Sequence, residues 1–133
     1  MYCNTITSPN YPFNYQNRVD KDFKIEVAGG QKIEIIFTEF DIENHQSCSW
    51  DWVQVVDGDG TELLPKTCGR NKPNSMIKSR TNQVYVKFHT DGSVTRKGFS
   101  AEWNNRRGRI CDISRNVSIK KNYIRYLYYG GIL

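Results

Sequence analysis

The sequence predicts an all-β fold, a sandwich of antiparallel strands with jelly-roll architecture. Short stretches of alternating apolar and polar residues recur along the first 105 residues, and turn-forming residues separate them. The 133 residues include 6 Phe, 8 Tyr and 3 Trp, a supply of aromatic side chains that suits a β-rich core. No segment before residue 105 has a convincing helical period, so the prediction contains no helix.

The first two strands are predicted in the region of residues 24–37. Ile25 and Val27 share one face of the first strand, with charged residues opposite. Residues 33–37 continue the alternation through two isoleucines and a phenylalanine. Gly29-Gly30 lies between the two runs and predicts a hairpin turn that would pair them.

Three further strands follow. Residues 53–55 alternate valine with glutamine, and the run Asp57-Gly58-Asp59-Gly60 directly after them is a strong turn signal. Residues 84–88 and 99–103 alternate again and end the pattern. Several short strands with regular turns are typical of a sandwich rather than of separate hairpins.

The domain is expected to span residues 3–105, and residues 106–133 to form a basic, aromatic tail of uncertain structure. The formal net charge is +5, but residues 1–105 carry 12 basic and 13 acidic residues, whereas residues 106–133 carry 7 and 1. The high isoelectric point therefore belongs to the tail, and a nucleic-acid partner is not expected for the domain.

Two sequence signals lie in this tail. Asn116-Val117-Ser118 is a sequon for N-glycosylation. Arg106-Arg107-Gly108-Arg109 resembles a proprotein-convertase site, with a solvated basic linker as the alternative. No stretch of the chain is long and apolar enough to predict a transmembrane helix.

The four cysteines lie at positions 3, 48, 68 and 111. Three states stay open for Cys3 and Cys111: a bond to each other, bonds outside this chain, or free thiols.

The sequence contains none of the common catalytic motifs. Its only histidines are His45 and His89, and neither HExxH nor GxSxG occurs. No glycine loop for phosphate is present either. The chain is therefore predicted to be a non-catalytic module.

Three acids are candidates for a metal site. Glu43, Asp51 and Asp91 each lie in a predicted loop beside a strand. Hard cations such as Ca²⁺ prefer carboxylate and carbonyl oxygens as ligands. The alternative is that the three acids form ordinary turn hydrogen bonds or salt bridges.

Several short signatures occur in an order that resembles a CUB domain over residues 5–104. They are Ser8-Pro9-Asn10-Tyr11-Pro12, Phe40-Asp41-Ile42-Glu43, Cys48-Ser49-Trp50-Asp51, Val55-Val56-Asp57-Gly58, Cys68-Gly69, Thr90-Asp91-Gly92-Ser93 and Gly98-Phe99. The resemblance implies an extracellular CUB-type β-sandwich that takes part in protein recognition. It extends to the calcium-binding CUB modules of complement-initiating proteases and of tolloid-type metalloproteases.

The resemblance also implies the residues of the site. Glu43, Asp51 and Asp91 match the acids that bind Ca²⁺ in this family, and the main-chain carbonyl of Ser93 matches a further ligand. Tyr15 matches a tyrosine whose hydroxyl supports the site. A Cys48–Cys68 disulfide is implied in the same way, as is a partner protein whose Lys contacts the calcium-site acids.

One departure from the family pattern concerns the first disulfide. Lys21 stands where its second cysteine would be, and Cys3 lies too close to Ser8-Pro9 to be its first. The first CUB domains of complement-initiating serine proteases share this absence. We therefore expect an extracellular calcium-binding recognition module of a larger secreted or cell-surface protein. The alternatives are an exosite fragment of a secreted protease whose catalytic domain is absent here, and a surface-binding protein driven by its basic tail.

Overall fold

The computed structural model describes residues 4–105 as eight strands joined by turns and loops. The strands are β1 (Asn4–Thr7), β2 (Asp20–Glu26), β3 (Ile33–Asp41), β4 (Trp52–Asp57), β5 (Glu62–Thr67), β6 (Ile77–Lys78), β7 (Gln83–His89) and β8 (Gly98–Asn105). The sequon at Asn116, the basic run at 106–109, Cys3 and Cys111 lie outside the described residues.

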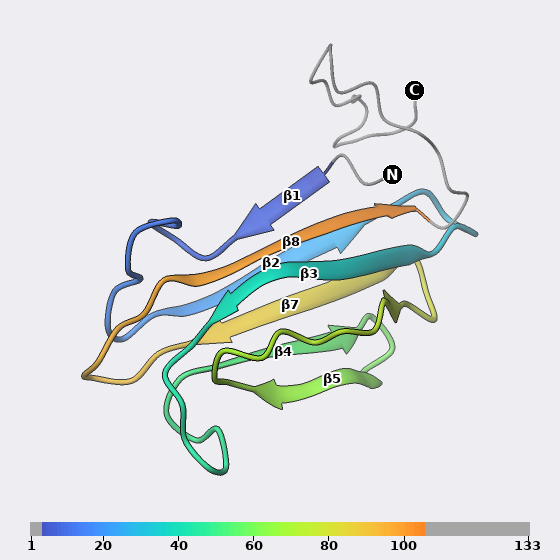
Figure 1. The fold of residues 1–133 in the computed structure, drawn as a ribbon. Coiled ribbons are helices and arrows are strands. Elements are labelled where there is room, and N and C mark those ends of the chain that lie inside the picture. Colours follow the sequence, from blue (N-terminus) through green and yellow to red (C-terminus); the bar gives the residue numbers. More distant parts are fainter. Residues whose placement is uncertain (1–3, 106–133) are drawn as a thin grey trace.

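The strands form two four-stranded sheets in the orders β1-β8-β3-β6 and β2-β7-β4-β5 (Figure 1). All the strand pairs are antiparallel. The prediction of an all-β antiparallel sandwich is confirmed, and no helix occurs within residues 4–105.

Alternate residues of the central strands fill the space between the sheets. Along β4 and β7 the buried positions are four valines, Phe88 and, at the end of β4, Asp57, and the residues between them are half-buried. The fully buried members of this core include Val53, Val55, Val84, Val86, Phe88, Ile33, Ile35, Phe37, Phe99 and Ala101. The apolar residues of the alternating pattern that predicted these strands are thus the residues that face the other sheet.

The hairpin predicted at Gly29-Gly30 is wrong. The turn is present, with Gln31 N–H donating to the Ala28 carbonyl at 3.0 Å, but β2 pairs with β7 whereas β3 pairs with β8 and β6. The turn therefore passes the chain from one sheet to the other. The same glycine turn can join two paired strands or two strands of different sheets. Pairing with distant strands determines which of the two forms.

Three strands escaped the sequence prediction, and all three are edge strands. β1 has four residues and β6 has two, so neither shows an alternation long enough to recognise. β5 contains Pro65, and proline is rare within strands. It is tolerated in an edge strand because its missing N–H need not donate to a neighbouring strand.

Gly98 allows the close packing where β8 begins. Its φ is +98°, and a Cβ at this position would overlap the Ser8 hydroxyl. That hydroxyl accepts a hydrogen bond of 3.0 Å from the Phe99 amide. The start of β8 thus packs against the loop after β1 with no room for a side chain.

We expect Gly98→Ala to lower the free energy of unfolding by about 3 kcal/mol, because it combines an unfavourable positive φ with overpacking. Gly30→Ala is the matched control. Its φ is +85° but nothing lies within 4 Å of the new Cβ, so the expected loss is only about 1 kcal/mol. Urea unfolding of both variants measures the difference, and equal losses would contradict the packing argument.

Candidate metal centre

The three candidate acids meet at one end of the sandwich. The pairing of Trp52 with His89 sets the start of β4 beside the end of β7, so Asp51 and Asp91 are neighbours within one sheet. Glu43 arrives from the other sheet, two residues after the end of β3. The cluster therefore joins the two layers of the fold.

The three side chains come close enough to share one ion. One carboxylate oxygen from each of Glu43, Asp51 and Asp91 lies within 4.8 Å of the other two. Asp51 is 0% exposed and Glu43 is 6% exposed, while Asp91 is half-buried. Burial of three carboxylates at this spacing is costly unless protons, donors or a cation compensate their charge.

Tyr15 holds two of the acids in place. Its hydroxyl donates to Asp51 Oδ2 at 2.7 Å and accepts a 3.0 Å hydrogen bond from the Glu43 amide. The ring is 1% exposed and packs edge-on against Phe88, with the ring centroids 5.2 Å apart. The tyrosine thereby connects the loop after β1 to both sheets.

Asp91 and Ser93 belong to a tight turn after β7. The Asp91 amide donates to Asp51 Oδ1 at 2.8 Å, and the Ser93 amide donates to Asp91 Oδ1 at 3.3 Å. On the neighbouring loop, the Arg18 amide donates to the Asp91 carbonyl at 2.8 Å. Ser93 thus lies beside the cluster, and its main chain is within the turn that orients Asp91.

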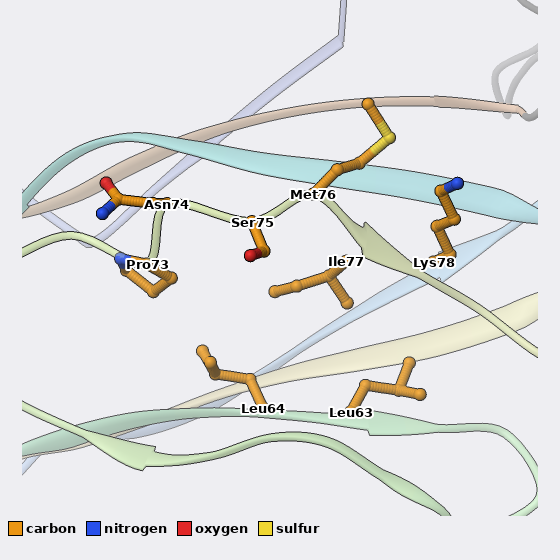
Figure 2. Close-up of a pocket in the computed structure, with 8 residues that line it drawn as sticks. All are labelled: Leu63, Leu64, Pro73, Asn74, Ser75, Met76, Ile77 and Lys78. Carbon is orange, nitrogen blue, oxygen red and sulfur yellow. The ribbon is translucent and has the colours of Figure 1, made fainter.

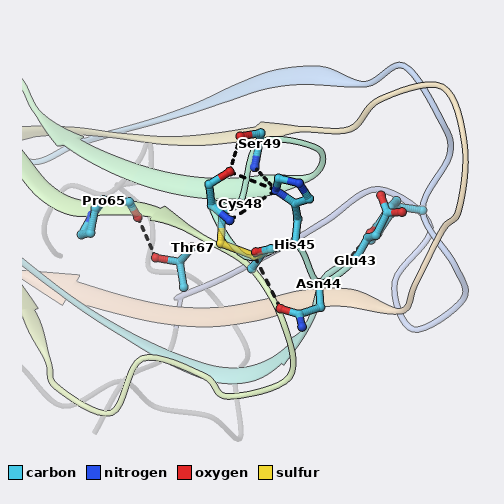
Figure 3. The surroundings of a disulfide bond; sticks show 10 residues. Glu43, Asn44, His45, Cys48, Ser49, Pro65 and Thr67 are labelled. Carbon is cyan, nitrogen blue, oxygen red and sulfur yellow. Dashed lines mark hydrogen bonds between the residues drawn. A yellow bond between two sulfur atoms is a disulfide. The ribbon is translucent and has the colours of Figure 1, made fainter.

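The loop between Glu43 and Asp51 is fastened at two points. A disulfide joins Cys48 to Cys68 across a sequence separation of 20 residues (Figure 3). Closing a loop of that size contributes about 3 kcal/mol in the chain-entropy model. Next to it, Ile42 and Gly69 exchange two backbone hydrogen bonds of 3.0 and 2.9 Å. Both contacts restrict where Glu43 can lie.

Without a cation, burial and mutual repulsion disfavour the ionised forms of the acids in the cluster. Burial, followed by the nearby charges of Asp51 and Asp91, raises the pKa of Glu43 above its usual value. Burial is also the main cause that raises the pKa of Asp51. The pKa of the Tyr15 hydroxyl is raised as well, mainly by burial, so it stays a donor to Asp51. A cation at the cluster would oppose these shifts in pKa, because it favours the ionised carboxylates.

The residues fit a hard cation. Glu43 Oε1 is buried and has no hydrogen-bond partner among residues 4–105. An unpaired buried carboxylate oxygen is rare and calls for an explanation such as an ion. The donor set is all oxygen, which suits Ca²⁺ and not the N and S preference of zinc.

Sequence reasoning missed Thr90, which is 1% exposed beside the cluster. Its hydroxyl donates to the Gln16 carbonyl at 2.8 Å and accepts from the Val19 amide at 2.8 Å. It thereby fixes the loop that carries Tyr15 against the end of β7. A buried threonine directly before Asp91 carries no signal in sequence, because its partners are main-chain groups more than 70 residues away.

Two ring side chains of the loop between Glu43 and Asp51 form a pair. His45 and Trp50 have ring centroids 4.1 Å apart, and Trp50 is 45% exposed. His45 Nδ1 lies 3.2 Å from the Ser49 amide, which donates to it. The pair shapes the loop around Cys48 and leaves an aromatic surface beside the acids.

Comparison with known proteins places the chain in a family. The family model for the CUB domain matches residues 2–103, and the chain belongs to this family. The chain is 42% identical over 101 residues to pig cubilin, covering 74% of this chain and 3% of cubilin. It is 39% identical over 98 residues to human tolloid-like protein 1, covering 72% of this chain and 10% of that protein. The chain therefore spans a small part of the length of these relatives.

Solved structures agree with this assignment. The full extracellular region of zebrafish Gpr126/Adgrg6 matches with a TM-score of 0.70 and 29% identity, over 79% of this chain and 15% of that one. The MASP-1 CUB2 domain bound to Ca²⁺ matches with a TM-score of 0.67 and 27% identity, over 74% of this chain and 88% of that one. The CUB fold is a non-catalytic module, and within residues 4–105 no helix is long and apolar enough to cross a membrane.

We expect Tyr15→Phe to lower the free energy of unfolding by about 2 kcal/mol, because the buried Glu43 amide and Asp51 carboxylate both lose a partner. Tyr85→Phe is the matched control, since the Tyr85 hydroxyl makes no hydrogen bond within residues 4–105, and should cost less than about 0.5 kcal/mol. Chemical denaturation in calcium-free buffer measures both. A Tyr15 variant as stable as the control would show that the bridge contributes nothing.

Proposed function

We propose that the chain contains a non-catalytic, extracellular calcium-binding module for protein recognition, part of a larger secreted or cell-surface protein. Residues 3–105 form this module and residues 106–133 a basic tail. The observation that carries the proposal is the acid cluster: three carboxylates from both sheets converge, and one buried oxygen among them lacks a partner. The disulfide between Cys48 and Cys68 supports an oxidising location.

Glu43, Asp51 and Asp91 would hold Ca²⁺ through their carboxylates, and Ser93 through its main-chain carbonyl. The similar MASP-1 CUB2 domain is bound to Ca²⁺, which supports this choice of ion. When bound, the ion supplies positive charge that offsets the repulsion between the acids. Tyr15 keeps Asp51 oriented by its hydrogen bond, in the way that supporting residues commonly position metal ligands.

Recognition would use the exposed part of the same site. Asp91 is half-buried, so a side chain from another protein can reach it. A Lys of the partner would pair with these acids, because its compact ammonium group suits a fixed carboxylate. Rigid acids lose little conformational entropy on contact, which favours affinity.

A second arrangement is favoured by the likeness to tolloid-like protein 1. In it the same module serves as an exosite of a secreted protease and binds the substrate away from the catalytic domain. The chemistry of the acid cluster is then unchanged, and only the role of the partner differs.

Calcium is expected to stabilise the folded domain. Extracellular sites of this kind have dissociation constants of about 10⁻⁴–10⁻³ M, and a tenfold excess over the dissociation constant adds about 1.4 kcal/mol. For a domain of this size that raises the melting temperature by about 7 °C. Asp51→Asn should remove the rise, whereas Asp22→Asn, which changes an exposed acid paired with Lys87, should keep it. Thermal unfolding with calcium and with chelator measures the effect; no rise in the wild type would contradict the site.

A synthetic peptide with one central lysine should bind the calcium-loaded protein and shift the NMR signals of residues around Asp91. The same peptide with acetyl-lysine should not bind, because acetylation removes the charge. Chelator or Asp51→Asn should abolish the shifts, and removal of residues 106–133 should leave them. Binding that disappears with the tail and persists in chelator would instead support a surface-binding protein driven by its basic tail.

A further inference from the structure

A groove with apolar walls opens along one side edge of the sandwich, away from the acid cluster. It lies between β5 and the segment that leads into β6, and its volume is about 320 Å³ (Figure 2). Leu63 and Leu64 form one wall, and Pro73, Met76 and Ile77 belong to the other. Met76 is 38% exposed, and its side chain points away from the two leucines (Figure 2).

The groove exists because β5 is irregular. Val55 pairs with Leu64 and Val56 pairs with Glu62, so Leu63 is an extra residue in the ladder. Such a bulge breaks the alternation of side chains along a strand. As a result Leu63 and Leu64, although consecutive, both point toward Ile77 (Figure 2).

Both strands that border the groove are sheet edges. β5 pairs only with β4, and β6 pairs only with β3. Their outer main-chain groups therefore remain available to an added strand, as in recognition by β-augmentation. β6 has only two residues, so the opposite sheet does not close over the leucines.

Basic residues outnumber acidic ones around the groove. Lys66 lies on β5, Lys72 on the segment that leads into β6, and Lys78 on β6. The acids nearby are Glu62, at the start of β5, and Glu34, which pairs with Lys78. Lys78 lines the groove, and Lys72 is exposed directly before Pro73. Within the described part of the chain, Lys66 and Lys72 have no carboxylate partner, and Lys66 lies over the Trp52 ring at 4.5 Å.

We propose that this groove binds an extended segment of a partner protein that carries a large apolar side chain flanked by acidic residues. The apolar side chain fills the space between Leu64 and Ile77, and the acids face Lys72 and its basic neighbours. A second copy of this chain fits the surface poorly, because edge-to-edge contact would bring two basic stretches together. The inference goes beyond the acid cluster, which would bind a partner of the opposite charge at the loop end.

The experiment is selection of binders from a displayed library of random peptides, using the full oxidised chain in calcium. The enriched peptides should contain an apolar residue next to Asp or Glu, and their binding should weaken as salt is raised. Lys72→Glu should weaken binding at least about tenfold, because it reverses a charge that faces the peptide. Lys24→Glu is the matched control: it reverses an exposed lysine on β2, at the opposite edge of the same sheet, and should change binding by less than about twofold.

A second variant tests the apolar wall. Leu64→Ser should also weaken binding about tenfold. Circular dichroism checks that Leu64→Ser is folded. If Leu64→Ser does not fold, Lys72→Glu still tests the proposal, because an exposed position tolerates substitution. Enriched peptides that are basic, or that bind Lys72→Glu as well as wild type, would overturn the proposal. So would a library that yields no binder, or self-association of the chain through this edge. Calcium stabilisation is unaffected by these outcomes, so failure here is distinct from failure of the metal site.

Discussion

The Tyr15 hydroxyl is the contact on which the loop end of this domain depends. It donates to Asp51 and accepts from the Glu43 amide, so one atom joins a loop after β1 to residues from both sheets. Because the ring is buried against Phe88, the hydroxyl has no freedom to find other partners. Two acids that would otherwise repel each other are thus held in a fixed arrangement.

That arrangement has an electrostatic consequence. The fold brings three carboxylates within one small space, and burial together with their mutual repulsion raises the pKa of Glu43. The disulfide, the Ile42–Gly69 bridge and Thr90 keep the loops from moving apart to relieve this repulsion. A preorganised, partly desolvated anionic site of this kind gains most from a bound cation, which supports calcium over a purely structural role.

The near-neutral charge of residues 1–105 hides a separation of charge in space. The acid cluster lies at the loop end, whereas Lys66, Lys72 and Lys78 lie along the edge formed by β5, β6 and the segment before β6. The proposed lysine contact and the proposed acidic peptide would therefore use different surfaces of one module. Such a module could hold two segments of partner protein at once, which would raise overall affinity through effective concentration.

The sequence by itself determined the fold class, because alternation along β3, β4, β7 and β8 reflects burial of one face of each strand. Glu43, Asp51, Asp91 and Tyr15 could be named from short motifs, since those motifs are local in the chain. Only the tertiary structure decided that the Gly29-Gly30 turn crosses between sheets, that β1, β5 and β6 are strands, and that the β5 bulge opens a groove. These features depend on pairing between residues far apart in sequence, and local propensity is the same for several pairings.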